Sequence, residues 1–377
     1  MQLLEGVVQH YDWGSPHAIP DLVGAPADGT PWAELWFGAH ERGPARLGDG
    51  TQLRDRIDHD PVGQLGDREE LPFLFKVLAA DKPLSIQAHP DRAQAEQGFA
   101  REDERRIPVD AFERSFRDRN PKPELICALT PFEALCGFRS PGDSVRRVEA
   151  VNRVELDPVV ELLRANAPES RRIGDCLRWF LDRSPAEAAT LVDAAVAVPG
   201  NEVYAQLHRH HPGDVGVLVA LLMHHVTLQP GEALFLGAGN LHAYVRGVGV
   251  ELMANSDNVV RGGLTTKHID RDTLLALIDC DSGRPRVQRP RGGVHTYEVP
   301  VADFSLTRVD RAKAVVELTG PAIALATDGE AQLANAAGGL VLARGQAAWI
   351  PACEERVEID AGAAQLHLAT TGTAAVR

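Results

Sequence analysis

The chain has 377 residues, of which 44% are hydrophobic and 24% are charged. This apolar content is sufficient for two or three cores and excludes an intrinsically disordered chain. The formal net charge of -14 disfavours a protein that binds nucleic acid or an anionic membrane surface. An anionic small substrate would need a local basic pocket set against this overall charge.

Residues 1 to about 140 show the pattern of a β-rich region. Short apolar runs are separated by Pro, Gly and Asp, as expected for strands that are joined by turns. One helix is expected over 91–100, where Asp91 follows a proline and can cap the first turn. The strands are predicted at 32–37, 73–78, 84–87 and 124–128.

From residue 144 to about 198 the pattern becomes helical, with apolar residues three and four positions apart. Ser184, Pro185 and Glu187 predict a helix start, because Ser can serve as the N-cap and Glu stands at the third helical position. A further helix is expected over 211–225, after which short strands and turns return.

This order predicts a β domain that is interrupted by helices and followed by a second β domain. The first β domain is expected to cover 1–140 and 205–285, the helical insertion 141–204, and the second β domain 286–377.

A local repeat supports this division, because residues 231–242 align without a gap with residues 345–356. Each copy has a Gly, a short half-apolar strand and then a Gly or Pro turn, as in a hairpin corner of a double-sheet β-barrel. His242 in the first copy corresponds to Arg356 in the second. Chemistry is therefore expected in the first copy, with the second serving as scaffold.

The cysteines and the N-terminus indicate a cytoplasmic protein. The five cysteines form no CxxC pair and lie in apolar or helical contexts, so neither a disulfide framework nor a thiolate metal site is expected. The first 13 residues lack the pattern of a signal peptide. The apolar stretch 215–223 is far shorter than the ~20 residues that cross a bilayer, so no membrane partner is expected.

Two short motifs contain possible metal ligands. Gln87 and His89 stand two apart in a predicted strand, so their side chains should share a face; an isolated pair of this kind can also be a satisfied polar pair near a strand end. Lys122 and Glu124 alternate with two prolines that favour extended backbone. Glu124 leads into a buried strand, where a carboxylate needs a metal, a cation or several hydrogen bonds. The alternative is a surface turn in which Lys122 and Glu124 form an incidental, exposed ion pair.

His242 follows the Gly-rich corner of the first repeat and alone could be a core imidazole. Together with Gln87, His89 and Glu124 it makes a mixed nitrogen and oxygen set that suits Zn²⁺ or another borderline divalent ion. A set with an amide and no thiolate leaves room for water or substrate oxygens, which is typical of a catalytic site.

A possible phosphate site lies further along the chain. Arg261 and Lys267 flank a Gly-Gly turn with nearby hydroxyl groups, and paired cations with exposed amides suit a phosphate monoester. The alternative is an ordinary loop in which Asp257 pairs with Arg261. The sequence contains no P-loop, no GxSxG and no HExxH motif, so nucleotide-dependent and standard serine hydrolase chemistry are not indicated.

Taken in order, these motifs resemble the type I phosphomannose isomerases, also called mannose-6-phosphate isomerases. The resemblance spans residues 7 to about 270 and is specific in its combination of motifs. The matching segments are YDWG at 11–14, AELWFGAH at 33–40, KPLSIQAHPD at 82–91, KPE at 122–124, FEALCGF at 132–138, PGEALFL at 230–236, HAY at 242–244, and 251–267.

The resemblance implies a zinc enzyme of the cupin superfamily that interconverts mannose 6-phosphate and fructose 6-phosphate through a cis-enediol(ate). The implied fold is mainly β, with a catalytic cupin (double-stranded β-helix, jelly-roll) barrel, a helical insertion and a second, metal-free cupin-like barrel at the C-terminus. It also implies one Zn²⁺ per subunit and an active-site arginine at Arg261. The implied zinc ligands are Gln87, His89, Glu124 and His242.

One position departs from the family pattern. The family has a histidine directly before the lysine of its KPE motif, and this chain has Pro121 there. Any acid/base role assigned to that histidine cannot apply here. We expect Glu251 to shuttle the proton instead, with Lys122 assisting at the substrate oxygens.

The remaining expected roles concern substrate binding. Arg261 and Lys267 are expected to stabilise charge and anchor the phosphate, and Ser85, Tyr244 and Asp257 to contact the sugar. Two alternatives stay open: another metal-dependent cupin enzyme acting on phosphosugars, and a non-catalytic sugar-binding cupin. The acidic exterior favours a monomer.

Overall fold

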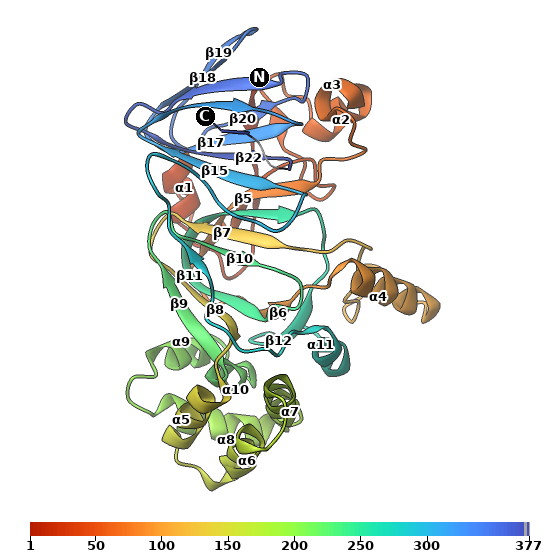
Figure 1. The fold of residues 1–377 in the computed structure, drawn as a ribbon, viewed down its shortest axis with the longest axis vertical. Coiled ribbons are helices and arrows are strands. Elements are labelled where there is room, and N and C mark those ends of the chain that lie inside the picture. The colour runs from red at the N-terminus through yellow and green to blue at the C-terminus, as the bar shows by residue number, and fades with distance from the viewer. Residues whose placement is uncertain (373–374, 377) are drawn as a thin grey trace.

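The computed structural model describes residues 1–372 and 375–376. In this part of the chain the strands form an 11-stranded, a 7-stranded and a 5-stranded sheet, and a group of helices covers one end of the molecule (Figure 1). The fold therefore has mixed β-sheets with a helical insertion, as the sequence predicts.

The 11-stranded sheet contains every strand that was predicted in the first half of the chain. The predicted strand at 84–87 lies slightly later, as β6, and ends directly before His89. Its strands are β2 (Val7–Gln9), β3 (Glu34–Phe37), β5 (Phe73–Ala80), β6 (Ile86–Ala88), β7 (Glu124–Ala128), β8 (Phe132–Phe138), β9 (Met223–Leu228), β10 (Ala233–Leu236), β11 (His242–Ala254), β12 (Val260–Gly263) and β13 (Val287–Gln288).

The long strand β11 connects two parts of this sheet. Its first residues pair with β6 and β8, whereas its later residues pair with β5 and β7. The pairing changes near Gly247, whose φ of 128° disfavours a side chain and where an added Cβ would lie 2.7 Å from the Pro131 carbonyl oxygen. This bend places His242 beside β6 and Glu251 beside β5 and β7.

The helical end of the molecule packs around one apolar cluster that contains Leu177, Phe180 and Leu218. The predicted start at Ser184 is confirmed, since Ser184 and Glu187 form a capping box. The helices are α5 (Pro141–Ala150), the 3₁₀ helix η1 (Val154–Leu156), α6 (Asp157–Arg164), α7 (Glu169–Leu181), α8 (Pro185–Val196), α9 (Glu202–His210) and α10 (Gly216–Leu221).

A helix lies within the predicted range 211–225, but its predicted bounds are wrong. The apolar run there is divided between α10 and the start of β9 at Met223. Because α10 is buried on all sides, its sequence has no polar face that could mark where the helix ends. The helix α9, directly before it, was not predicted.

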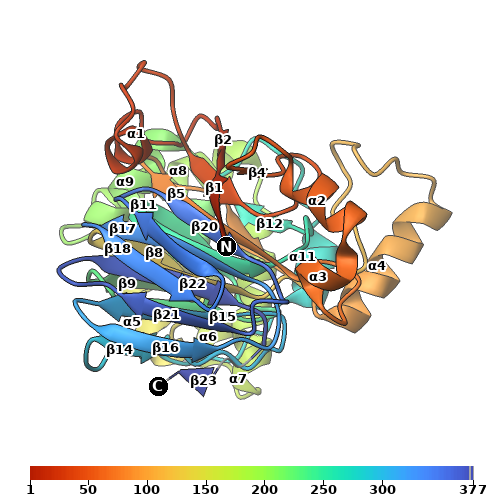
Figure 2. The same cartoon turned by 90° about the horizontal axis from the view of Figure 1, so that it is seen from above.

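The other helices lie along the β-sheets, and α2, α3 and α4 share one side of the molecule (Figure 2). Asp91 caps α4, as predicted, and forms a capping box with Gln94. The helix extends beyond the expected end at Ala100. None of the described helices has both the length and the apolar character of a membrane span. These helices are α1 (Ala18–Val23), α2 (Leu53–His59), α3 (Pro61–Leu65), α4 (Arg92–Glu104) and α11 (Arg271–Leu277).

The C-terminal strands form two sheets that pack face to face around residues such as Leu333, Val357 and Leu368. The 7-stranded sheet contains β14 (Val294–Thr296), β15 (Ser305–Asp310), β22 (Gln365–Thr370), β17 (Ala322–Asp328), β20 (Ala347–Ile350), β1 (Gln2–Glu5) and β4 (Arg46–Leu47). The 5-stranded sheet contains β19 (Gly338–Leu342), β18 (Ala331–Asn335), β21 (Arg356–Asp360), β16 (Lys313–Glu317) and β23 (Ala375–Val376).

The first strand of the chain belongs to the C-terminal sheet. β1 pairs with β20, so Gln2 lies opposite Trp349. Residues that the predicted division assigns to the first β domain are therefore hydrogen-bonded to the second.

The local repeat seen in the sequence recurs as structure. β10 and β20 occupy equivalent positions of the two copies, and β11 and β21 begin at the aligned residues His242 and Arg356. Gly231 and Gly345, which open the copies, have φ of 85° and 82°. Both corners thus need a residue without a Cβ.

Candidate metal centre

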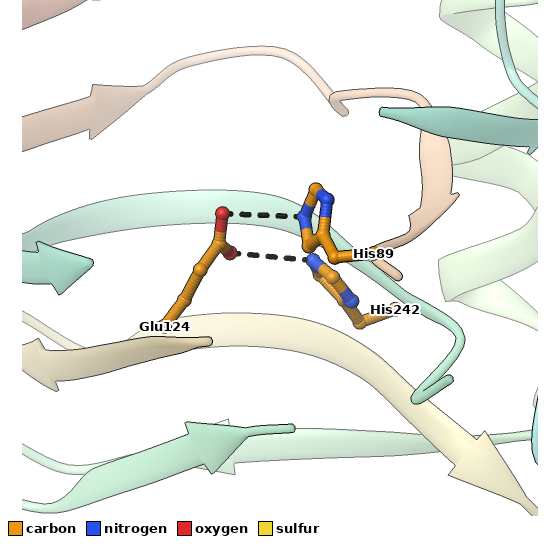
Figure 3. Close-up of side chains that lie close together, drawn as sticks. All are labelled: His89, Glu124 and His242. Atoms are coloured by element: carbon orange, nitrogen blue, oxygen red, sulfur yellow. Dashed lines mark ion pairs between the residues drawn. The ribbon is translucent and has the colours of Figure 1, made fainter. Parts of the chain in front are cut away.

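Three of the four predicted metal ligands converge in the 11-stranded sheet. His89 follows β6, Glu124 opens β7 and His242 opens β11, and their ligand atoms all lie within 4.8 Å of one another. Each side chain is at most 2% exposed. The two imidazoles lie side by side, each facing one oxygen of Glu124 (Figure 3).

Each of the two imidazole rings lies close to one oxygen of the Glu124 carboxylate. His89 Nε2 is 3.2 Å from Glu124 Oε1, and His242 Nε2 is 3.4 Å from Glu124 Oε2. Gln87 lies opposite His242 in the β6–β11 register and opposite Arg261 in the β6–β12 register. The fourth predicted ligand therefore stands next to the other three.

Hydrogen bonds on the far side of each ring fix which nitrogen carries the proton. His89 Nδ1 lies 2.7 Å from the Asn258 carbonyl, and His242 Nδ1 lies 3.0 Å from the Asn240 carbonyl. A carbonyl only accepts, so both Nδ1 atoms donate and both Nε2 atoms present a lone pair. Burial, with the Lys122 charge, lowers the pKa of His89 to about 4 and keeps its ring neutral.

This donor set fits a divalent cation. Among the described residues, neither Nε2 atom nor Glu124 Oε2 has a hydrogen-bond partner, although all three are buried. Lone pairs that face a carboxylate repel it unless a cation lies between them. Two neutral imidazoles, a carboxylate and an amide oxygen are ligands that Zn²⁺ accepts.

Lys122 and Glu124 form a buried pair, which rules out the alternative of a surface turn. Lys122 Nζ is 3.0 Å from Glu124 Oε1, and the lysine is 8% exposed. Burial alone would raise the pKa of the Glu124 carboxyl, but Lys122 and the two histidines hold it well below its usual range. Lys122 thus directs its charge at the metal centre.

Glu251 and Tyr244 lie further along β11. Glu251 is buried, and its Oε2 lies 2.7 Å from Lys76 Nζ. Burial raises the pKa of Glu251 against the opposing effect of Lys76, while Glu124 and Glu34 raise it further. The Tyr244 ring centroid lies 6.0 Å from that of His242, and its buried hydroxyl has no hydrogen-bond partner among the described residues.

Lys76, the partner of Glu251, and Glu34, the second partner of Lys76, are not among the residues that the sequence motifs single out. Lys76 Nζ is also 3.2 Å from Glu34 Oε1, and Trp36 Nε1 donates to Glu34 Oε2 at 2.6 Å. Lys76 is the one charged residue in the apolar strand β5. A single charge in such a strand is the feature of the sequence that indicates a buried partner. A lone lysine in a fully buried strand has to be paired.

A second group of charges contains only cations. Arg261 lies on β12. Burial and the charge of Arg117, a residue that was not predicted, lower the pKa of Arg261. Burial and the charges of Arg261 and Arg117 lower the pKa of Lys267. Within the described part of the chain, none of the three side chains forms an ion pair or hydrogen bond. We call Arg117, Arg261 and Lys267 the cationic cluster.

Asp257 does not neutralise this cluster, which rules out the alternative of an ordinary loop in which Asp257 pairs with Arg261. Asp257 instead pairs with Arg42, and its Oδ2 lies 3.5 Å from His40 Nε2. Burial would raise the pKa of Asp257, but these partners hold it well below its usual range. Asp257 also lines a cavity of about 720 Å³ with Arg117 and Asn120.

Ser85 lies directly before β6 and is half-buried. Its place in the chain puts it two residues from Gln87. The described residues give its hydroxyl no hydrogen bond, so its expected contact with the sugar stays a prediction.

Comparison with known proteins assigns the chain to a family. Residues 1–141 match the family described as phosphomannose isomerase type I, catalytic domain. Mannose-6-phosphate isomerase of Salmonella typhimurium is 38% identical, over 95% of this chain and 96% of the relative. That of Escherichia coli is 37% identical, over 95% and 97%, and that of Homo sapiens 32% identical, over 83% of each.

Solved structures show the same similarity in three dimensions. An alanine mutant of phosphomannose isomerase from Salmonella typhimurium superposes with a TM-score of 0.92 at 35% identity, covering 99% of this chain and 100% of that one. A zinc-bound crystal structure of mannose 6-phosphate isomerase gives a TM-score of 0.89 at 35% identity, covering 99% of each chain. This chain belongs to the type I phosphomannose isomerase family.

Proposed function

We propose that this protein interconverts mannose 6-phosphate and fructose 6-phosphate with one zinc ion held by Gln87, His89, Glu124 and His242. The observation that carries the proposal is the convergence of two Nε2 lone pairs on the buried Glu124 carboxylate. Relatives that share more than a third of their residues over nearly the whole chain have this activity in their names, and one solved relative is zinc-bound.

We also propose the finer division of the fold. A cupin barrel would hold the metal centre, α5 to α10 would be its helical insertion, and the C-terminal sheets would form a second cupin-like barrel without a metal. The equivalence of β10 and β20 supports a common origin of the two barrels. In the second copy, Arg356 replaces the metal ligand His242.

The reaction moves a proton between C2 and C1 of the open-chain sugar through an enediol(ate). A bound zinc ion would supply stabilisation of the negative charge that develops on the sugar oxygens. Lys122, which lies beside Glu124, can donate to those oxygens from its buried position. The cationic cluster would hold the phosphate, because no carboxylate in the described part of the chain pairs with it.

Glu251 remains our candidate for the proton-transferring base. Its raised pKa moves the carboxyl toward the range in which a base is effective near neutral pH. Its contact with Lys76 keeps the carboxylate oriented. Pro121 has no titratable group and therefore takes no part in proton transfer.

A coupled assay of purified protein with mannose 6-phosphate tests the proposal. We expect fructose 6-phosphate to form, formation to stop after chelation, and zinc to restore it. If protein with full zinc occupancy gave no turnover, the proposed substrate would be wrong.

A further inference from the structure

Asn258 connects the metal centre to the segment that carries Arg117. It lies between β11 and β12 and is completely buried. Its carbonyl accepts from His89 Nδ1 at 2.7 Å. This is the bond that turns the His89 lone pair toward Glu124.

The Asn258 side chain binds a different part of the chain. Its Oδ1 accepts from the backbone N–H groups of Arg117 and Asp118, at 2.7 and 3.1 Å. Its Nδ2 donates to the Asp118 and Asn120 carbonyls, at 3.0 and 2.9 Å, and also reaches Asp118 Oδ1 at 3.1 Å. A single amide thus uses all of its donors and acceptors on residues 117–120.

These bonds matter because the segment is not held by the backbone hydrogen bonds of a helix or a sheet. Residues 117–120 lie outside any helix or strand, and the following prolines at 121 and 123 have no N–H to donate to a neighbouring strand. Asp118 adds a second connection, since its carboxylate accepts from Ser256 Oγ at 2.9 Å and from the Asp257 N–H at 2.7 Å. The segment leads directly to Lys122 and Glu124.

We propose that Asn258 is a positioning residue that fixes His89 and Glu124 for zinc and Arg117 for the phosphate. The inference rests on the proposed function only in naming those two ligands. One buried residue then sets two separate binding properties, so that its loss weakens both zinc binding and phosphosugar binding in a chain that still folds.

The test compares Asn258→Ser with Asn201→Ser. Asn201 is also buried, but it donates to the Ala195 carbonyl at 2.9 Å within the helical end and is remote from the metal centre. Three quantities are measured for wild type and both variants: the zinc Kd by competition with a chromogenic chelator, the KM for mannose 6-phosphate, and the Tm of the metal-free protein.

We expect Asn258→Ser to weaken zinc binding by about tenfold or more and to raise KM, since groups that orient a ligand have effects of this size. Asn201→Ser should lower Tm while both binding constants stay at the wild-type values. A folded Asn258→Ser variant whose zinc Kd stays within about twofold of wild type overturns the proposal.

A second variant decides the matter if Asn258→Ser does not fold. Asp118→Asn keeps the size of the side chain but weakens its bonds to Ser256 and Asp257. It should weaken zinc binding in the same direction, and an unchanged zinc Kd overturns the proposal. Because zinc binding is measured without substrate, a wild-type chain that binds zinc but does not convert mannose 6-phosphate would refute the proposed activity and leave this inference standing.

Discussion

At the scale of single residues, the metal centre combines three ligands at strand boundaries with surrounding residues that reach it through partners distant in sequence. His89, Glu124 and His242 each stand at the boundary of a strand in a short motif, so their types and positions are visible along the chain. Lys76, Glu34 and Asn258 act through partners that are distant in sequence. Their contacts depend on which strands are neighbours in the sheet, and no local pattern encodes that.

Substitution of Arg261 tests whether the cationic cluster binds the phosphate. Arg261→Ala removes a cation that no described carboxylate neutralises, so the loss should fall on the phosphate. A charge-assisted hydrogen bond is worth about 1.5–3 kcal/mol, which corresponds to roughly a tenfold to hundredfold loss in kcat/KM, mainly through KM. Inhibition by inorganic phosphate should weaken in parallel.

The control is Arg246→Ala on β11, where the arginine is exposed and pairs with Glu133. This variant should keep the wild-type KM and phosphate inhibition. An Arg261→Ala enzyme with unchanged KM would show that the phosphate binds elsewhere.

Substitution of Glu251 tests whether this residue is the proton-transferring base. Glu251→Gln keeps the shape of the side chain and removes its ability to take a proton, so turnover should fall by about 10² to 10⁴. Exchange of the C2 proton with solvent should fall equally, while zinc content stays the same. Glu133→Gln on β8 is the matched control, because its partners His225 and Arg246 lie away from the metal centre. Near-normal turnover in Glu251→Gln would remove Glu251 from the mechanism.

At the scale of elements, β11 organises the site. Its two halves pair with different strands, and this places a metal ligand at one end and the candidate base nine residues later. The sequence predicted the short strands and the capped helices well, because turns and caps have local signatures. It failed over 211–225, where burial on all sides removes the periodic pattern that separates helix from strand.

Gly247 is the point where the pairing of β11 changes, and replacing it should disturb both halves. Its φ of 128° is unfavourable for a side chain, and a Cβ would lie 2.7 Å from the Pro131 carbonyl oxygen. We expect Gly247→Ala to lower the free energy of unfolding by about 1–3 kcal/mol, measured by urea denaturation, and to weaken zinc binding. Gly283→Ala, at a position with open space around it, should have neither effect. A fully stable Gly247→Ala variant would mean that β11 needs no bend there.

At the scale of the whole molecule, the two β regions share one buried interface. Leu125 and Ala233 of the 11-stranded sheet pack in the same cluster as Ile323 and Trp349 of the 7-stranded sheet. The N-terminal residues reinforce this contact, because Trp349 Nε1 donates to Gln64 Oε1 at 2.8 Å. The 7-stranded sheet therefore supports the sheet that holds the metal centre, and a change that destabilises this interface should lower the stability of both sheets.

His367 makes that interface sensitive to acid. It is fully buried on β22, with Nδ1 3.1 Å from Thr327 Oγ1, Nε2 3.8 Å from Cys127 Sγ on β7, and Arg308 opposite it on β15. Burial, with the Arg308 charge, lowers its pKa to about 3, whereas an unfolded histidine titrates near about 6.5. The folded state therefore prefers the neutral ring, and its stabilising contribution is complete above about pH 6.5 and is lost as the pH falls toward about 3.

Between about pH 6.5 and 3, the contribution of His367 to the free energy of unfolding should fall by up to about 1.4 kcal/mol per pH unit, in addition to the effect of other groups. His367→Asn keeps a polar partner for Thr327 but cannot take up a proton. We expect it to be less stable than wild type at pH 8, with the difference in unfolding free energy shrinking as the pH falls from about 6.5 to 4. Urea denaturation at a series of pH values measures this, and His59→Asn on the exposed face of α2 is the control. Parallel stability curves for wild type and His367→Asn would mean that the buried ring does not account for the acid sensitivity of the interface.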